Sequence, residues 1–157
     1  MPSKSTESTE RKTIVKTKKR AVTASENGNN MGEHKKYEDI HFVDSTKPVW
    51  NYSLFSKEDI ENFQRGTHYR LYELFGNKQF EVLGTPGTYF AVWAPNATQV
   101  NVTGNFNDWN KDSHQLFVRL DHSGIWEGFV PGVGIGALYK FHIRSRNHGA
   151  VLIKTDP

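Results

Sequence analysis

The chain of 157 residues contains no cysteine. This absence excludes disulfide bonds and thiolate metal sites, and it makes a reducing compartment the simpler expectation. The first residues include no apolar segment of the kind found in secretory signals. No apolar run approaches the roughly 18 residues needed to span a bilayer. We therefore expect a soluble, cytoplasmic protein with no membrane partner.

Motifs for cofactor or metal binding are also missing. The segment 132–136 reads GVGIG, but it lacks the Gly-Lys-Ser/Thr ending of a phosphate loop and the Gly-x-Gly-x-x-Gly spacing, and it lies between two expected strands. The seven histidines are scattered, and no pair has the spacing of a zinc site. We expect no cofactor and no metal.

Paired carboxylates for glycoside chemistry are not evident either. Retaining glycosidases need two carboxyl groups about 5 Å apart across the scissile bond. The acidic residues of the second half fall mostly in expected turns and form no obvious pair: Asp108, Asp112, Asp121, Glu127 and Asp156. We assign no catalytic residue.

Basic charge is concentrated near the start of the chain. The net charge is +3, yet the first 20 residues hold seven Lys and Arg against two Glu. Residues 1–47 have few large apolar side chains and no sustained periodicity, which predicts a disordered basic tail. Such a tail could neutralise phosphates. Solvated disorder is the commoner fate of a Ser/Thr/Lys-rich terminus, so we expect no nucleic-acid partner.

Residues 48–66 are predicted to form a docking segment followed by a short helix. The first concentrated apolar residues of the chain lie between Val49 and Phe55. Ser56 is the expected N-cap, with Asp59 completing a capping box, and Gly66 is the expected C-terminal stop.

Residues 67–157 have the texture of a β domain. Short runs rich in aromatic and β-branched residues alternate with turn sequences, which is typical of an antiparallel β-sandwich. The expected strands are 69–74, 80–83, 88–93, 100–106, 115–120, 125–130, 137–144 and 150–154, with a turn at 84–87. There is room for one core.

The stretch 100–110, VNVTGNFNDWN, combines a strand with a polar turn. Apolar and polar residues alternate as far as Phe106, which is therefore expected in the core. Asn and Asp residues, which favour tight turns, then surround Trp109. An aromatic ring among side-chain amides is a plausible platform for a sugar, because the C–H groups of a pyranose pack on the ring while the amides bind hydroxyls. The alternative is that Trp109 folds back as a lid on the sandwich edge.

Four motifs of this region occur together in a recognisable order. They are WAPNA at 93–97, GNFNDW at 104–109, GIWEG at 124–128 and YKF at 139–141. The stretch Gly66–Pro157 thereby resembles the family 48 carbohydrate-binding module at the N-terminal end of glycogen branching enzymes. The resemblance implies an immunoglobulin-like β-sandwich that binds an α-1,4/α-1,6 glucan.

The same resemblance suggests individual site residues. In the family, the lysine of the Tyr-Lys-Phe motif holds the glucan beside the tryptophan, a role that falls here on Lys140. Alternation along 137–144 also directs Lys140 away from the core, although an ordinary solvated lysine fits equally well. Asn107 and Asn110 are lesser polar candidates beside Trp109. Some relatives, such as the glycogen-binding module of the AMP-activated kinase β subunit, add a second tryptophan after this strand, but residues 144–149 contain no aromatic.

A branching enzyme cuts an α-1,4 glucan and rejoins it as an α-1,6 branch in a glycoside hydrolase family 13 barrel. The resemblance implies that such a barrel follows the module and is its partner, and these residues alone should be inactive. Two other interpretations stay open. The sandwich could pack on the barrel without binding sugar, or it could be a separate regulatory module that targets glycogen.

Overall fold

The computed structural model describes residues 43–147 and 149–156. The expected disordered tail, residues 1–47, lies almost entirely outside the described residues. Within them the elements follow the order α1 (Lys57–Arg65), η1 (Leu71–Glu73), β1 (Gly76–Val82), β2 (Thr85–Trp93), β3 (Ala97–Gly104), η2 (Asn105–Asn107), β4 (Phe117–Val118), β5 (Ile125–Pro131), β6 (Tyr139–Ser145) and β7 (Val151–Lys154). None of these helices is long and apolar enough to cross a membrane.

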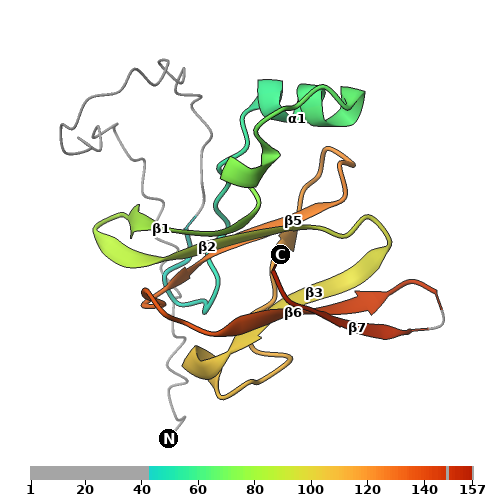
Figure 1. Ribbon diagram of the computed structural model, residues 1–157. Helices are drawn as coiled ribbons and strands as arrows, with labels where there is room; N and C mark the ends of the chain where they lie inside the picture. The colour runs from blue at the N-terminus through green and yellow to red at the C-terminus, as the bar shows by residue number, and fades with distance from the viewer. Residues whose placement is uncertain (1–42, 148, 157) are drawn as a thin grey trace, which may run out of the picture. The chain divides into compact units, whose positions relative to one another are not determined.

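The strands form two antiparallel sheets that face each other (Figure 1). One sheet has the order β1-β2-β5-β4 and the other β3-β6-β7. Side chains from β2, β3, β5 and β6 meet between them in one core cluster that includes Phe90, Val102, Trp126 and Phe141. The predicted antiparallel β-sandwich is confirmed.

The larger sheet is covered on both faces. A second core cluster joins the outward side chains Tyr89, Ile125 and Phe129 to Trp50 and Phe55 of the preceding segment. Trp50 also pairs with Phe129 through two backbone hydrogen bonds of 2.7 and 3.0 Å. Consequently β5 is buried along nearly its whole length and β2 is buried without interruption from Gly87 to Ala91, whereas a strand with one wet face would alternate between buried and exposed residues.

Helix α1 begins and ends where its sequence signals predict. The Ser56 side chain accepts a hydrogen bond from the Asp59 backbone N–H, and the Asp59 carboxylate accepts one from the Ser56 backbone N–H at 2.8 Å. Gly66 ends the helix in the left-handed conformation, with φ 71°. Each cap satisfies backbone groups that the helix itself leaves unpaired.

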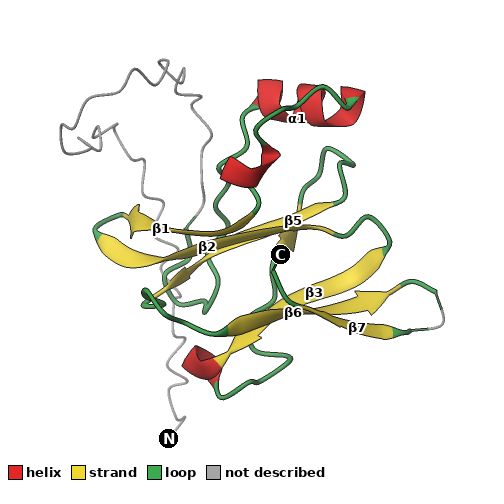
Figure 2. Ribbon diagram, in the orientation of Figure 1, coloured by secondary structure: helices red, strands yellow, loops and turns green. Residues whose placement is uncertain are grey.

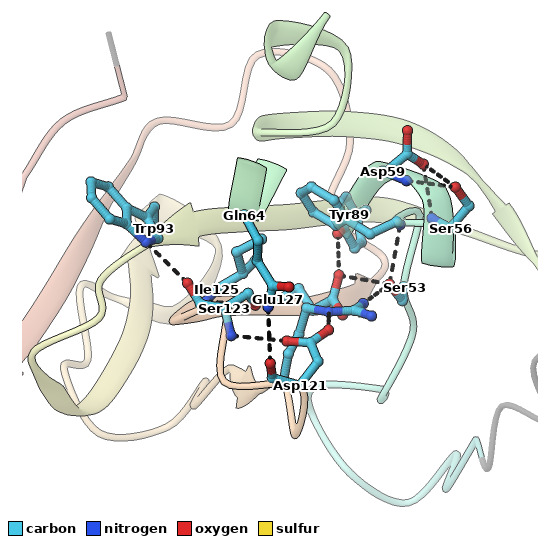
Figure 3. A network of polar contacts seen from close by, with 12 residues as sticks. Ser53, Ser56, Asp59, Gln64, Tyr89, Trp93, Asp121, Ser123, Ile125 and Glu127 are labelled. Carbon is cyan, nitrogen blue, oxygen red and sulfur yellow. Dashed lines mark hydrogen bonds and ion pairs between the residues drawn. The ribbon is translucent and has the colours of Figure 1, made fainter. Parts of the chain in front are cut away.

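A buried polar network fixes the segment before α1 to the larger sheet (Figure 3). Glu127, on β5, is 4% exposed and accepts hydrogen bonds from Tyr89 at 2.5 Å and from Ser53 at 2.9 Å. The Arg119 guanidinium reaches the same carboxylate at 2.6 Å and also contacts Asp121 and Ser53. Burial raises the pKa of the Glu127 carboxyl, although the charge of Arg119 opposes this effect.

Several expected elements were wrong, and the first is the strand at 69–74. Residues Leu71–Glu73 form a 3₁₀ helix instead. Arg70 and Glu73 approach each other with i,i+3 spacing, which a helical turn allows and an extended strand does not. Tyr69 and Tyr72 are exposed, so the aromatic residues of this segment do not form a buried strand face.

The turn expected at 84–87 was also misplaced. The connection between β1 and β2 consists of Leu83 and Gly84, both with positive φ, and Val82 lies opposite Thr85. Two such residues suit a type I′ hairpin, whose twist matches that of the flanking strands. Pro86 therefore lies within β2.

The strand expected at 100–106 begins and ends earlier in the structure, and the one expected at 115–120 is much shorter. β3 ends at Gly104, and Phe106 lies in η2, where it is partly buried against the core. Leu116 donates a hydrogen bond to Val100 of one sheet, whereas β4, two residues long, pairs with β5 of the other. This segment therefore crosses from one sheet to the other, so it cannot form one long strand.

Candidate functional site

The candidate site is built on residues 105–110, called here the Trp109 turn, which follow β3. The Trp109 backbone N–H donates to the Gly104 carbonyl at 2.8 Å, and the Asn110 N–H donates to the Asn107 carbonyl at 2.9 Å. Asp108 and Trp109 both adopt left-handed backbone conformations, with φ of 52° and 58°. This conformation is unfavourable for a bulky side chain and persists only where surrounding contacts enforce it.

Gly104 allows the turn to approach the neighbouring strand. A Cβ atom at this position would lie 2.3 Å from the Leu138 carbonyl oxygen and 2.6 Å from the Phe106 ring. The Asn105 backbone N–H donates to that same carbonyl at 3.1 Å. A larger residue than glycine would therefore push the turn away from the start of β6.

Asn107 braces the turn from inside. Its side-chain oxygen accepts the Gly104 N–H at 2.9 Å, and its amide nitrogen contacts the Val102 carbonyl at 3.1 Å, the Ser113 hydroxyl at 3.2 Å and His114 Nδ1 at 3.0 Å. Burial lowers the pKa of His114, which favours the neutral ring that can accept this last hydrogen bond. These contacts give Asn107 a positioning role, and its direct contact with sugar stays a prediction.

Trp109 projects from this braced turn and is 44% exposed. Within the described part of the chain it contacts no other aromatic ring and no cation-π partner. Its neighbour Asn110 is exposed and accepts a hydrogen bond from the Asp112 N–H at 2.9 Å. The indole therefore offers surface to a ligand.

Lys140 belongs to the same end of the smaller sheet. It lies on β6 opposite Thr103, one residue from the pair formed by Gly104 and Tyr139. Lys140 is exposed while Phe141 is buried, as alternation predicts. Among the described residues no ion pair involves Lys140. The fold thus brings residues that are 31 positions apart in sequence, Trp109 and Lys140, to one end of the β3–β6 pair.

Comparison with known proteins gives this site a context. The family model for carbohydrate-binding module 48 (isoamylase N-terminal domain) matches residues 74–157. The chain belongs to this family. Its module is accordingly an immunoglobulin-like β-sandwich, as the resemblance implied.

Similar proteins carry the printed name 1,4-alpha-glucan branching enzyme GlgB. That of Cellvibrio japonicus is 50% identical over 99 residues, which are 63% of this chain and 13% of the relative. That of Butyrivibrio fibrisolvens is 47% identical over 104 residues, or 66% of this chain and 16% of the relative. That of Synechococcus sp. (strain JA-3-3Ab) is 47% identical over 95 residues, or 60% and 12%. The chain therefore spans a small part of the length of the relatives it matches.

Sequence reasoning missed three features of the module. Leu138 is exposed beside the Trp109 turn, and no periodicity distinguishes it from other aliphatic residues. The outward-directed side chains of Asn101 and Thr103 on β3 are buried, and their polar atoms have no hydrogen-bond partner within the described residues. Trp93, 57% exposed, lines an apolar hollow of about 390 Å³ together with Pro95, Phe141 and Leu152.

No group of His, Asp and Glu residues in the described segments is placed to hold a metal.

Proposed function

We propose that this chain binds an α-glucan of the glycogen or starch type, with Trp109 as the stacking platform and Lys140 as a donor to sugar hydroxyls. The observation that supports this proposal most directly is the half-exposed Trp109 in a left-handed, internally braced turn. Surface tryptophans are costly to leave in water, and strained backbone concentrates at functional sites. A braced turn also keeps the ring in one orientation before a ligand arrives.

The chemistry of the site matches a polysaccharide rather than a charged ligand. An indole face covers the C–H groups of a glucose ring, and the Lys140 ammonium supplies three donors for hydroxyl oxygens. Asn110, at the exposed edge of the turn, is a further polar partner. With a single aromatic platform we expect a dissociation constant of roughly 0.1 to 1 mM, which corresponds to about −4 to −5.5 kcal/mol.

We further propose that the module positions an α-1,4 glucan for a 1,4-α-glucan branching enzyme of the cytoplasm. The relatives' printed names support this role. Weak binding suits it, because a tethered site raises the effective concentration of a polymer near a catalytic domain. The branching chemistry and the catalytic barrel are part of this proposal.

Replacement of Trp109 tests the binding function. Trp109→Ala removes the platform, so we expect at least a tenfold loss of affinity for glycogen, measured by affinity electrophoresis, with little change in melting temperature. Trp126→Ala is the matched control. Trp126 is 5% exposed and donates from Nε1 to the Ala94 carbonyl at 3.1 Å. Its loss should cost about 3–5 kcal/mol of unfolding free energy.

If Trp109→Ala migrates in glycogen like the wild-type protein, the sugar site is not at Trp109. A large drop in melting temperature for the same variant would instead identify Trp109 as a packing residue.

The apolar hollow beside Trp93 favours a second candidate function, in which the sandwich packs on another domain without binding sugar. In that case neither the wild-type chain nor any variant would be retarded by glycogen.

A further inference from the structure

Leu138 is an exposed aliphatic residue fixed next to the Trp109 turn. It is 65% exposed and immediately precedes β6. Its backbone N–H donates to the Asn105 side-chain oxygen at 3.2 Å, and its carbonyl accepts the Asn105 N–H at 3.1 Å. The short helix η2, at the end of β3, lies beside the start of β6 in Figure 2. Leu138 is therefore held by the same residue that begins the turn.

One backbone hydrogen bond, from the Asn105 N–H to the Leu138 carbonyl, continues the contact between the two segments just beyond the last β3–β6 pair, Gly104 and Tyr139. In an extended strand, residues two apart lie on one face. Leu138 directly precedes β6 and is two residues from Lys140, so we expect the two side chains on the same face. Trp109 is anchored to the same end of β3 through its hydrogen bond to Gly104. The backbones of Trp109, Leu138 and Lys140 are thus all attached at this end of the β3–β6 pair.

A chain of α-1,4-linked glucose presents apolar C–H surface on successive rings, so one tryptophan covers only part of what the polymer offers. Residues 144–149, at the end of β6 and just after it, include no aromatic residue for a second contact. Leu138 already exposes an apolar side chain near Lys140, and it belongs to neither of the two core clusters. Burying that side chain against a sugar would remove apolar surface from water at both partners.

We propose that Leu138 is the second apolar contact of the glucan site and covers the glucose next to the one on Trp109. The proposal rests on the proposed function, since it assigns a further residue to the same site. It makes Leu138 a determinant of chain-length preference. A maltose molecule can occupy the Trp109 platform alone, whereas a longer chain reaches both side chains.

The test compares Leu138→Ala with Leu120→Ala in the full chain. Leu120 is 91% exposed on the connection between β4 and β5, so its replacement controls for loss of an exposed leucine elsewhere. By titration calorimetry with maltoheptaose, we expect Leu138→Ala to weaken binding about three- to tenfold. Leu120→Ala should bind as wild type does. With maltose, the Leu138→Ala effect should fall to less than about twofold.

The outcomes separate this proposal from the proposed function. If Trp109→Ala weakens binding but Leu138→Ala binds maltoheptaose like wild type, the Leu138 proposal is overturned and the proposed function stands. If neither variant matters, or wild type does not bind, both fail. If Leu138→Ala lowers the melting temperature, Leu138→Gln keeps the length of the side chain without its apolar end, and affinity equal to wild type would overturn the proposal.

Discussion

Removal of Arg119 should destabilise the module, because it leaves the buried Glu127 carboxylate without its cation. The Arg119 and Glu127 side chains are 18% and 5% exposed, and their charged atoms lie 2.6 Å apart. In Arg119→Ala the Glu127 carboxylate keeps its hydrogen bonds from Tyr89 and Ser53 but loses its cation. Breaking a buried pair in this way typically costs about 3–5 kcal/mol. The Arg119 guanidinium also lies over the Phe55 ring, with its central carbon 5.7 Å from the ring centre, and this cation–π contact adds to the loss.

The loss of unfolding free energy expected for Arg119→Ala is large for a domain of this size. Small domains have unfolding free energies of about 5–15 kcal/mol, so the variant should retain little stability. At about 4 °C per kcal/mol, its melting temperature should fall by about 12–20 °C. Thermal unfolding followed by circular dichroism measures this directly. Arg70→Ala is the control, because Arg70 forms a surface pair with Glu73 and its removal should leave the melting temperature close to that of the wild type.

Two further measurements test the mechanism. Without Arg119 the pKa of Glu127, already raised by burial, should rise further, so the folded state should bind a proton more readily than the unfolded chain does. An acid whose pKa is raised by folding stabilises the fold below its unfolded pKa, and this contribution is lost as pH rises through the folded pKa. The loss of unfolding free energy in Arg119→Ala, relative to the wild type, should therefore be smaller at about pH 4.5, the ordinary pKa of Glu, than at about pH 7.5.

The double variant Arg119→Met with Glu127→Gln removes the unpaired charge and should be more stable than Arg119→Ala alone. A loss of less than about 1 kcal/mol in Arg119→Ala would refute the argument. So would a double variant no more stable than the single one, because an uncompensated charge would then not be the cause.

Two other predictions follow from backbone and histidine chemistry. Leu83→Asn should raise the unfolding free energy by about 0.5–1 kcal/mol in urea titrations, because Asn tolerates the φ of 53° next to Gly84 better than Leu does. An unchanged denaturation midpoint would contradict this. The neutral His114 ring has a lowered pKa, so its contribution to stability is present above its ordinary pKa of 6.5 and is lost as pH falls below it. Melting curves of wild type and His114→Gln between about pH 5 and 7.5 should diverge at the acid end of this range, with the wild type changing more.

Much of the candidate site follows from local sequence. The Asn- and Asp-rich stretch 105–110 favours a tight turn, and alternation places Lys140 on the exposed face of β6. The Ser56 and Asp59 capping box and the Gly66 stop are equally local, and the structure reproduces them. The physical reason is that these features depend on hydrogen bonds and backbone preferences within a few residues.

The tertiary structure decided which residues meet. Pairing of β3 with β6 brings Trp109, Leu138 and Lys140 to one end of a sheet, although nothing in the sequence fixes that register. The segment Val49–Phe55 covers the second face of the larger sheet, so alternation in β2 and β5 is hidden by burial on both sides. Glu127 illustrates the same limit, because its partners Ser53, Tyr89 and Arg119 come from three separate segments. Sequence periodicity records which face of a strand is apolar, whereas long-range pairing depends on the packing of the whole chain, and that packing determined the surroundings of the site.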